Sequence, residues 1–156
     1  MTEQCCPSFD AEGWQNRTHT WTRKRFIKDK VFCLMNMPVG FGHTMKRVMS
    51  RLEAAKAECP DWLCLSDHTS KWNMDVYVAV DREIPGAIAA ELDGRFYSRV
   101  YEGPFSDTGK WCKDFEDQAH NENLSIEKQY LWYTTCPKCA KKYGKNPVVI
   151  FGKITE

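Results

Sequence analysis

In two segments of this chain, aromatic or charged residues occupy alternate positions, which brings them onto one face of a β-strand. In residues 72–80, Met74 and three valines alternate with Asp75 and Tyr77. In residues 96–101, two tyrosines and Arg99 alternate with Phe96, Ser98 and Val100. If the more apolar face of each strand packs on a helix, the opposite face carries a set of aromatic and charged residues: Asp75, Tyr77, Tyr97, Arg99 and Tyr101. Trp72 and Tyr133 are expected at the rim of the same surface.

Such a surface suits a flat organic ligand. Aromatic rings bury a large apolar area and attract positive charge, with about 0.5–2 kcal/mol for each favourable cation–π contact. A carboxylate beside the rings can balance a cationic ligand or orient water toward an electrophilic carbon, and Asp75 and Glu102 are the candidate catalytic acids. The alternative interpretation is ordinary strand packing, because β-sheets favour aromatic residues in any case.

A second candidate site is the Cys136-Pro137-Lys138-Cys139 motif. Two thiols at this spacing can bind zinc or form a redox disulfide. A closed zinc site needs two more ligands, for which Cys5 or Cys6, or a histidine, is available. The alternative is a purely structural hairpin. We therefore expect no cofactor, with zinc as the open possibility.

Composition limits the remaining function classes. The 156 residues carry 22 basic and 21 acidic side chains and a net charge of +1, without the clustered positive charge of a nucleic-acid interface. No apolar run reaches the length of a membrane span, and the first residues do not resemble a signal peptide. No Gly-x-Ser-x-Gly elbow or phosphate-binding glycine loop occurs. We expect a cytoplasmic protein without direct nucleic-acid or membrane partners.

The distribution of apolar residues predicts an α+β fold made of two β-α-β-β units in a single domain. The first unit, residues 26–81, has a strand at 26–37, a helix whose buried stripe runs from Met45 to Cys59, a short strand at 62–66 and a strand at 72–80. Residues 67–70 are expected to form a turn.

The second unit, residues 87–155, repeats this order. It has a strand ending at Glu102, a helix from Thr108 to Ala119, and strands at 128–135 and 148–154. Residues 136–146 are an expected insertion, and residues 1–25 an N-terminal extension whose Trp14 and Trp21 are large enough to fill a groove.

Four identities support a duplication. Phe41, Thr44, Lys46 and Ala55 recur 64 positions later, as Phe105, Thr108, Lys110 and Ala119. Two copies of one unit must bury faces, and a seam between copies is a natural place for a pocket. The sheets are expected to have both helices on one side and a ligand groove on the other.

The doubled unit together with Glu102-Gly103-Pro104-Phe105 resembles the GyrI-like small-molecule-binding family over about residues 26–155. The resemblance implies two pseudo-symmetric halves and a ligand groove. Members of that bacterial-type family bind hydrophobic or cationic drugs, and others modulate DNA gyrase.

A subfamily hydrolyses cyclopropane-containing natural products with an aromatic cage and a glutamate. The matching strand here, residues 128–135, carries Gln129 to Tyr133 and no acid after Lys128. On this resemblance Asp75 or Glu102 would have to replace that glutamate.

Three functions follow, in this order. The first is a stand-alone protein that binds an apolar, planar or cationic small molecule in an aromatic groove. The second is a hydrolase that opens a strained or electrophilic ring by means of a groove carboxylate. The third is a cysteine-rich or zinc-stabilised interaction module with a protein partner.

Overall fold

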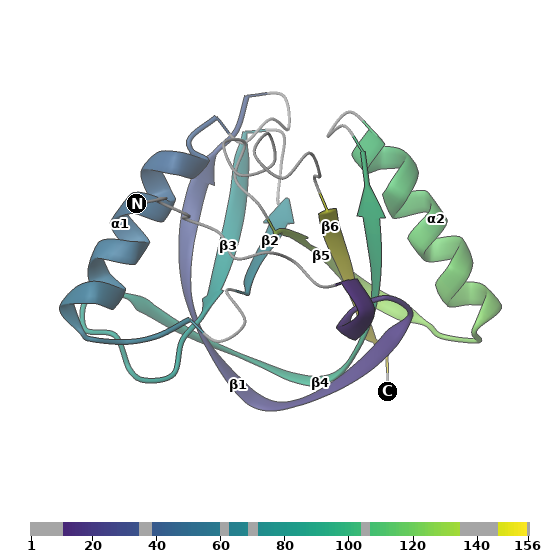
Figure 1. The fold of residues 1–156 in the computed structure, drawn as a ribbon, viewed down its shortest axis with the longest axis horizontal. Helices are drawn as coiled ribbons and strands as arrows, with labels where there is room; N and C mark the ends of the chain where they lie inside the picture. Colours follow the sequence, from purple (N-terminus) through teal and green to yellow (C-terminus); the bar gives the residue numbers. More distant parts are fainter. Residues whose placement is uncertain are drawn as a thin grey trace. The chain divides into compact units, whose positions relative to one another are not determined.

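The computed structural model describes residues 11–34, 39–59, 63–68, 72–103, 107–134 and 147–155. The chain divides into two compact units. The first unit is Thr22–Asp93, and the second unit comprises Met1–Trp21 with Gly94–Glu156. Each contains three antiparallel strands and one α-helix among the described residues, so the α+β prediction and the β-α-β-β order are confirmed (Figure 1).

In the first unit, β3 (Asn73–Ala79) is the central strand between β1 (Arg17–Phe32) and β2 (Cys64–His68). The helix α1 (Phe41–Ala54) buries Thr44, Val48 and Leu52, which recur every four residues. Val48 and Leu52 pack on Ile27, Val78, Val80 and Ile84, while Phe41 packs on a second cluster around Val31 and Met74.

In the second unit, β6 (Pro147–Ile154) is the central strand between β4 (Ile88–Glu102) and β5 (Ile126–Tyr133). A short 3-10 turn, η1 (Ala11–Gly13), precedes β1. The helix α2 (Thr108–Asn121) buries Trp111, Phe115 and Ala119. These side chains pack against one face of the sheet, on Tyr97, Leu131, Val148, Ile150 and Ile154.

The two helices end in the same way. After α1, Lys56 has a φ of 54° and the Ala57 N–H donates to the Leu52 carbonyl at 2.9 Å. After α2, Asn123 has a φ of 59° and the Leu124 N–H donates to the Ala119 carbonyl, also at 2.9 Å. This is the Schellman motif, in which a left-handed residue stops the helix and satisfies its last carbonyls.

The helices therefore correspond at an offset of 67 and not 64. The buried residues pair as Thr44 with Trp111, Val48 with Phe115 and Leu52 with Ala119. Thr44 is the fourth residue of α1 whereas Thr108 is the first residue of α2, so the identities at offset 64 do not occupy equivalent helical positions. The duplication was inferred from a register that the helices do not share.

Several element boundaries were also wrong. The strand expected from residue 26 begins at Arg17, and the helical stripe expected to reach Cys59 ends at Ala54, because Lys56 leaves the helical conformation. Asp67 and His68 lie in β2 and not in a turn. The strand expected at 72–80 is confirmed as β3, and the expected insertion 136–146 lies outside the described residues.

Candidate functional site

The sheet face of the first unit that points away from α1 carries an acidic and aromatic group. Met74, Val76 and Val78 pack on the helix side. Because side chains alternate across a strand, Asp75 and Tyr77 point to the other side, as predicted. In the register, Asp75 lies between Asp67 of β2 and Lys30 of β1, and Lys28 of β1 lies opposite Tyr77. We call this surface the acidic face; its members are Phe26, Lys28, Leu65, Asp67, Asp75 and Tyr77.

The two carboxylates of the acidic face are deeply placed. Asp67 is 8% exposed and Asp75 is 9% exposed. The Lys28 Nζ lies 3.5 Å from Asp75 Oδ2 and 5.6 Å from the centre of the Tyr77 ring. The Tyr77 ring in turn meets Phe26 edge to face, with 6.4 Å between centroids.

Charge makes this arrangement chemically distinctive. Carboxylates directly opposite each other on neighbouring strands repel, and buried charge is costly unless it is compensated. Tyr77 and Asp75, in that order, raise the pKa of Lys28 above its ordinary value, which keeps this side chain positively charged. The acidic face is therefore built to hold positive charge beside aromatic rings.

The corresponding face of the second unit, which points away from α2, is apolar instead. It carries seven rings, which we call the aromatic cluster: Trp14, His19, Trp21, Phe96, Tyr130, Trp132 and Phe151. Trp14 meets Trp132 at 5.0 Å between centroids, and Trp21 meets Phe96 at 4.4 Å. Phe96 and Phe151 are fully buried.

Hydrogen bonds fix the N-terminal segment onto this cluster. The Ser98 hydroxyl donates to the Trp14 carbonyl at 2.7 Å and lies 2.8 Å from His19 Nε2. The Val100 N–H donates to Gln15 Oε1 at 2.9 Å. Residues 14–21 thus cover this face of their own unit, and the large rings of Trp14 and Trp21 fill the space on it.

The expected orientation of the second set of aromatic residues was wrong. The Tyr97 ring packs on Phe115 and the Tyr101 ring stacks on Trp111, so both point toward α2. Tyr133 packs against the same helix-side core, and Arg99 Nη1 lies 3.2 Å from the Tyr97 hydroxyl. Both faces of β4 are covered by apolar groups, so alternation alone did not distinguish the helix side from the other side.

The remaining predicted residues are not members of the acidic face. Glu102 is exposed at the end of β4, in register with Pro147. Trp72 is 49% exposed and accepts a hydrogen bond from the Cys33 N–H through its carbonyl, just before β3. Cys5, Cys6, Cys136 and Cys139 lie outside the described residues. Within the described ranges, Cys33, Cys59, Cys64 and Cys112 are in no disulfide, and no cluster of metal-binding side chains occurs.

Four members of the acidic face were missed by sequence reasoning: Asp67, Lys28, Phe26 and Leu65. Asp67 was assigned to a turn because Asp67-His68-Thr69-Ser70 is rich in turn-forming residues. The signal that could have placed it is the alternation of Leu63, Leu65 and Asp67 along one strand face. Lys28 and Phe26 alternate in the same way on β1.

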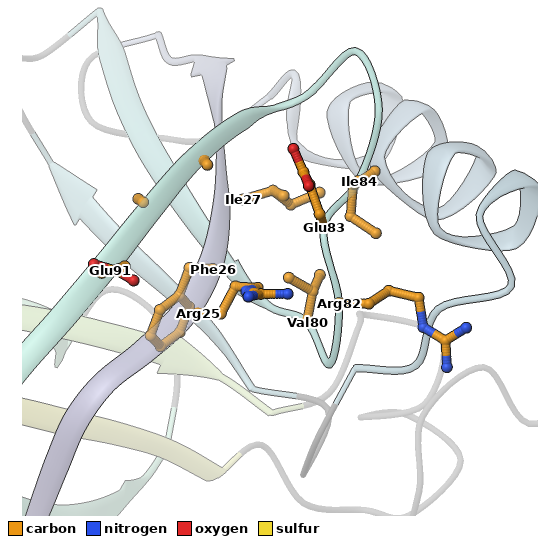
Figure 2. Close-up of a pocket in the computed structure, with 10 residues that line it drawn as sticks. Arg25, Phe26, Ile27, Val80, Arg82, Glu83, Ile84 and Glu91 are labelled. Carbon is orange, nitrogen blue, oxygen red and sulfur yellow. The ribbon is translucent and has the colours of Figure 1, made fainter.

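A surface pocket of about 580 Å³ adjoins this region of the first unit (Figure 2). Its buried lining includes Phe26, Ile27, Val80 and Ile84, and its charged lining is Arg25, Arg82, Glu83 and Glu91. Arg82 pairs with Asp81 and Glu91 pairs with Arg23. The lining carries two charges of each sign, so the pocket itself favours neither cations nor anions.

No helix in the described part of the chain combines the length and the apolar character needed to cross a membrane.

The architecture matches solved structures at low sequence identity. The C-terminal domain of EcmrR aligns with a TM-score of 0.65 and 8% identity, over 92% of this chain and 98% of that chain. A hydrolase from Listeria innocua aligns with a TM-score of 0.58 and 9% identity, over 90% and 92%. SAV2435, in a structure bound to tetraphenylphosphonium, aligns with a TM-score of 0.50 and 12% identity, over 90% and 94%.

These similarities show an α+β fold shared with the three structures, which is consistent with the GyrI-like resemblance. Residues 1–154 match the family described as "Bacterial hydrolase", and the chain belongs to that family. No curated protein matches the sequence.

Proposed function

We propose that this protein binds a small organic cation with apolar or aromatic substituents, and that the acidic face of the first unit holds it. The observation that carries the proposal is the opposed pair Asp67 and Asp75, about nine-tenths buried beside the Tyr77 and Phe26 rings. A cation between the carboxylates relieves their repulsion, while the rings contact its apolar groups.

The solvent edge of the acidic face supports this assignment. Phe32 lies at the end of β1, on the same strand face as Lys28, and is 57% exposed. An exposed ring close to a buried carboxylate offers an aryl substituent a surface to stack on. The structural neighbour SAV2435, which is bound to tetraphenylphosphonium, makes this cation a suitable first probe.

Calorimetric titration with tetraphenylphosphonium tests the proposal. We expect saturable binding by the full chain, weakened about ten- to hundredfold by Asp75→Asn or Asp67→Asn, because opposite unit charges about 6–10 Å apart attract by about 1.7–2.8 kcal/mol at an effective dielectric constant of about 20. Glu53→Gln is the matched control, since it neutralises an exposed carboxylate on α1 of the same unit. Equal weakening by the control, or no effect of either aspartate, would remove the acidic face from the proposal.

A second candidate function is ring-opening hydrolysis of an electrophilic ligand, favoured by the family assignment and by the paired carboxylates. Asp75 would accept a proton from water as the water oxygen bonds to the electrophilic carbon. The ring bond at that carbon breaks, and its leaving atom takes up a proton, so the net change is addition of one water.

Styrene oxide is a simple probe for this activity, with the diol product measured by chromatography. We propose Asp75 as the base in preference to Glu102, because Asp75 is buried beside rings and Glu102 is exposed. Asp75→Asn should abolish turnover. Loss of turnover in Glu102→Gln with full activity in Asp75→Asn would assign the acid to Glu102 instead.

A further inference from the structure

The acidic face already contains a positive charge in the place where the proposed ligand would carry its own. The Lys28 ammonium contacts the Asp75 carboxylate at 3.5 Å and lies over the Tyr77 ring at 5.6 Å. These are the two interactions, ion pairing and cation–π contact, that an aromatic-rimmed acidic site offers an organic cation.

We propose that Lys28 is a resident cation of the acidic face, which an incoming organic cation displaces, so that this side chain selects which cations the protein accepts. This inference rests on the proposed function, because it concerns the same carboxylates. It adds a specificity-determining residue and a displacement step.

Geometry permits the displacement. The Lys28 side chain is 36% exposed whereas that of Asp75 is 12% exposed, so the ammonium is at the solvent side of the pair. Lysine has a flexible four-carbon stem that can carry its head into water without moving the backbone. The residues before and after Lys28 on β1, from Phe26 to Phe32, all pair with β3. The backbone of β1 therefore stays in place when the side chain moves.

Hydration determines which cations succeed. The lysine ammonium is compact and strongly hydrated, and regains favourable hydration when it leaves the carboxylate. A bulky cation with spread charge loses less hydration when it is buried, and its apolar groups gain contact with rings. Small, strongly hydrated cations such as methylammonium gain little contact with the rings and compete poorly with Lys28. The acidic face thus discriminates by charge distribution as well as by charge.

Titrations of four proteins with tetraphenylphosphonium test the inference. Lys28→Met removes the resident charge and should tighten binding about tenfold, equivalent to about 1.4 kcal/mol. Lys28→Arg keeps a cation that can contact both partners and should leave the affinity close to that of the wild type. Lys46→Met removes the same charge from an exposed position on α1 of the same unit and should change the affinity less than about twofold.

The outcomes separate the two ideas. Absence of binding by both the wild type and Lys28→Met overturns the proposed function and the inference together. Binding that depends on Asp75 but is equal in the wild type and Lys28→Met, or weaker in Lys28→Met, overturns the inference alone. Equal tightening by Lys46→Met would mean that overall charge, not the position of Lys28, controls affinity, and would also overturn it.

Chemical labelling gives a second measurement that needs no variant. The acylation rate of each lysine in the wild-type protein can be followed by mass spectrometry with and without saturating tetraphenylphosphonium. We expect Lys28 to react faster in the saturated protein, because its ammonium has been released to solvent, while the exposed Lys46 of α1 reacts at the same rate. Unchanged or slower labelling of Lys28 in a saturated protein contradicts displacement.

Discussion

The two sheet faces that point away from the helices are built from different side chains. In the first unit this face carries Lys28, Asp67 and Asp75 beside Tyr77. In the second unit the equivalent face is a cluster of rings, covered by Trp14, His19 and Trp21 from the chain's own N-terminal segment. Both units have the same strand–helix–strand–strand order, but the outward face is charged in the first unit and apolar in the second.

The helix sides also differ in how they are fastened. Arg47 of α1 makes two contacts with the Asp29 carboxylate, of 3.0 and 2.8 Å, and the Thr44 hydroxyl donates to the Lys30 carbonyl. In the second unit, the Tyr101 hydroxyl donates to Asp114 at 2.7 Å and its ring stacks on Trp111. Burial, and then the Asp114 contact, raise the pKa of Tyr101, so its proton stays in place. The first helix is held partly by charge, and the second mainly by rings.

The two units are expected to contribute unequally to stability. Opposed carboxylates on an inner sheet face contribute little to stability, because like charges repel. A packed ring cluster contributes much, since aromatic side chains bury the largest areas. We infer that the second unit provides more of the folding free energy and that the first unit keeps the chemically reactive surface.

The largest expected change in stability concerns two equivalent helix positions. Phe115→Ala should lower the free energy of unfolding by about 3–5 kcal/mol, because it leaves a cavity among Trp111, Tyr97 and Ile150. Val48→Ala at the corresponding position of α1 removes two buried methyl groups and should cost about 1–2 kcal/mol. Urea unfolding measures both. Equal losses would show that the units are packed alike and would end the comparison.

A second test compares two aromatic residues on the outward sheet faces. Trp21→Ala should destabilise by about 1–3 kcal/mol, since its ring contacts Phe96 and Phe151. Phe32→Ala in the first unit should change stability by less than about 0.5 kcal/mol, because its ring is 57% exposed. The same denaturation assay applies. A larger loss for Phe32→Ala than for Trp21→Ala would reverse our assignment of the filled and open faces.

The smallest expected change in stability concerns the ion pair between Arg47 of α1 and Asp29 of β1. The Arg47 hydrogen bonds hold the pKa of Asp29 below its ordinary value of 3.8. A lowered carboxyl pKa contributes stability above the unfolded-state pKa, and this contribution is lost as pH falls through the folded-state pKa. The stability difference between wild type and Arg47→Met should therefore shrink as pH is lowered from 6 to about 3. A difference that stays constant over this range would show that Arg47 acts through packing rather than charge.

Much of the fold could be predicted from the sequence. Alternation along residues 73–79 gave both the strand and the side on which Asp75 and Tyr77 lie, because one face of that strand is uniformly apolar. The spacing of Thr108, Trp111, Phe115 and Ala119 gave the second helix and its buried stripe. Patterns of this kind are local, so they can be read without knowing what packs where.

The candidate site was only partly predictable. Asp67 joins Asp75 through strand pairing between residues eight positions apart, and the local residue types around Asp67 favour a turn. On β4, Phe96, Tyr97 and Ser98 are all nearly inaccessible, so no alternation of polarity indicates which side faces the helix. That direction is set by contacts with the rings of Trp111 and Phe115 on α2. These rings reach β4 only when the helix folds back onto the sheet.

By itself the sequence determined the element order and the alternating faces of its cleanest strand, because these depend on periodicities of two and about four residues. Tertiary structure alone decided that two aspartates meet, that Lys28 stands between a carboxylate and a ring, and that tyrosines expected on an open face support a helix. Those outcomes depend on register and on contacts between distant segments, which no local pattern encodes.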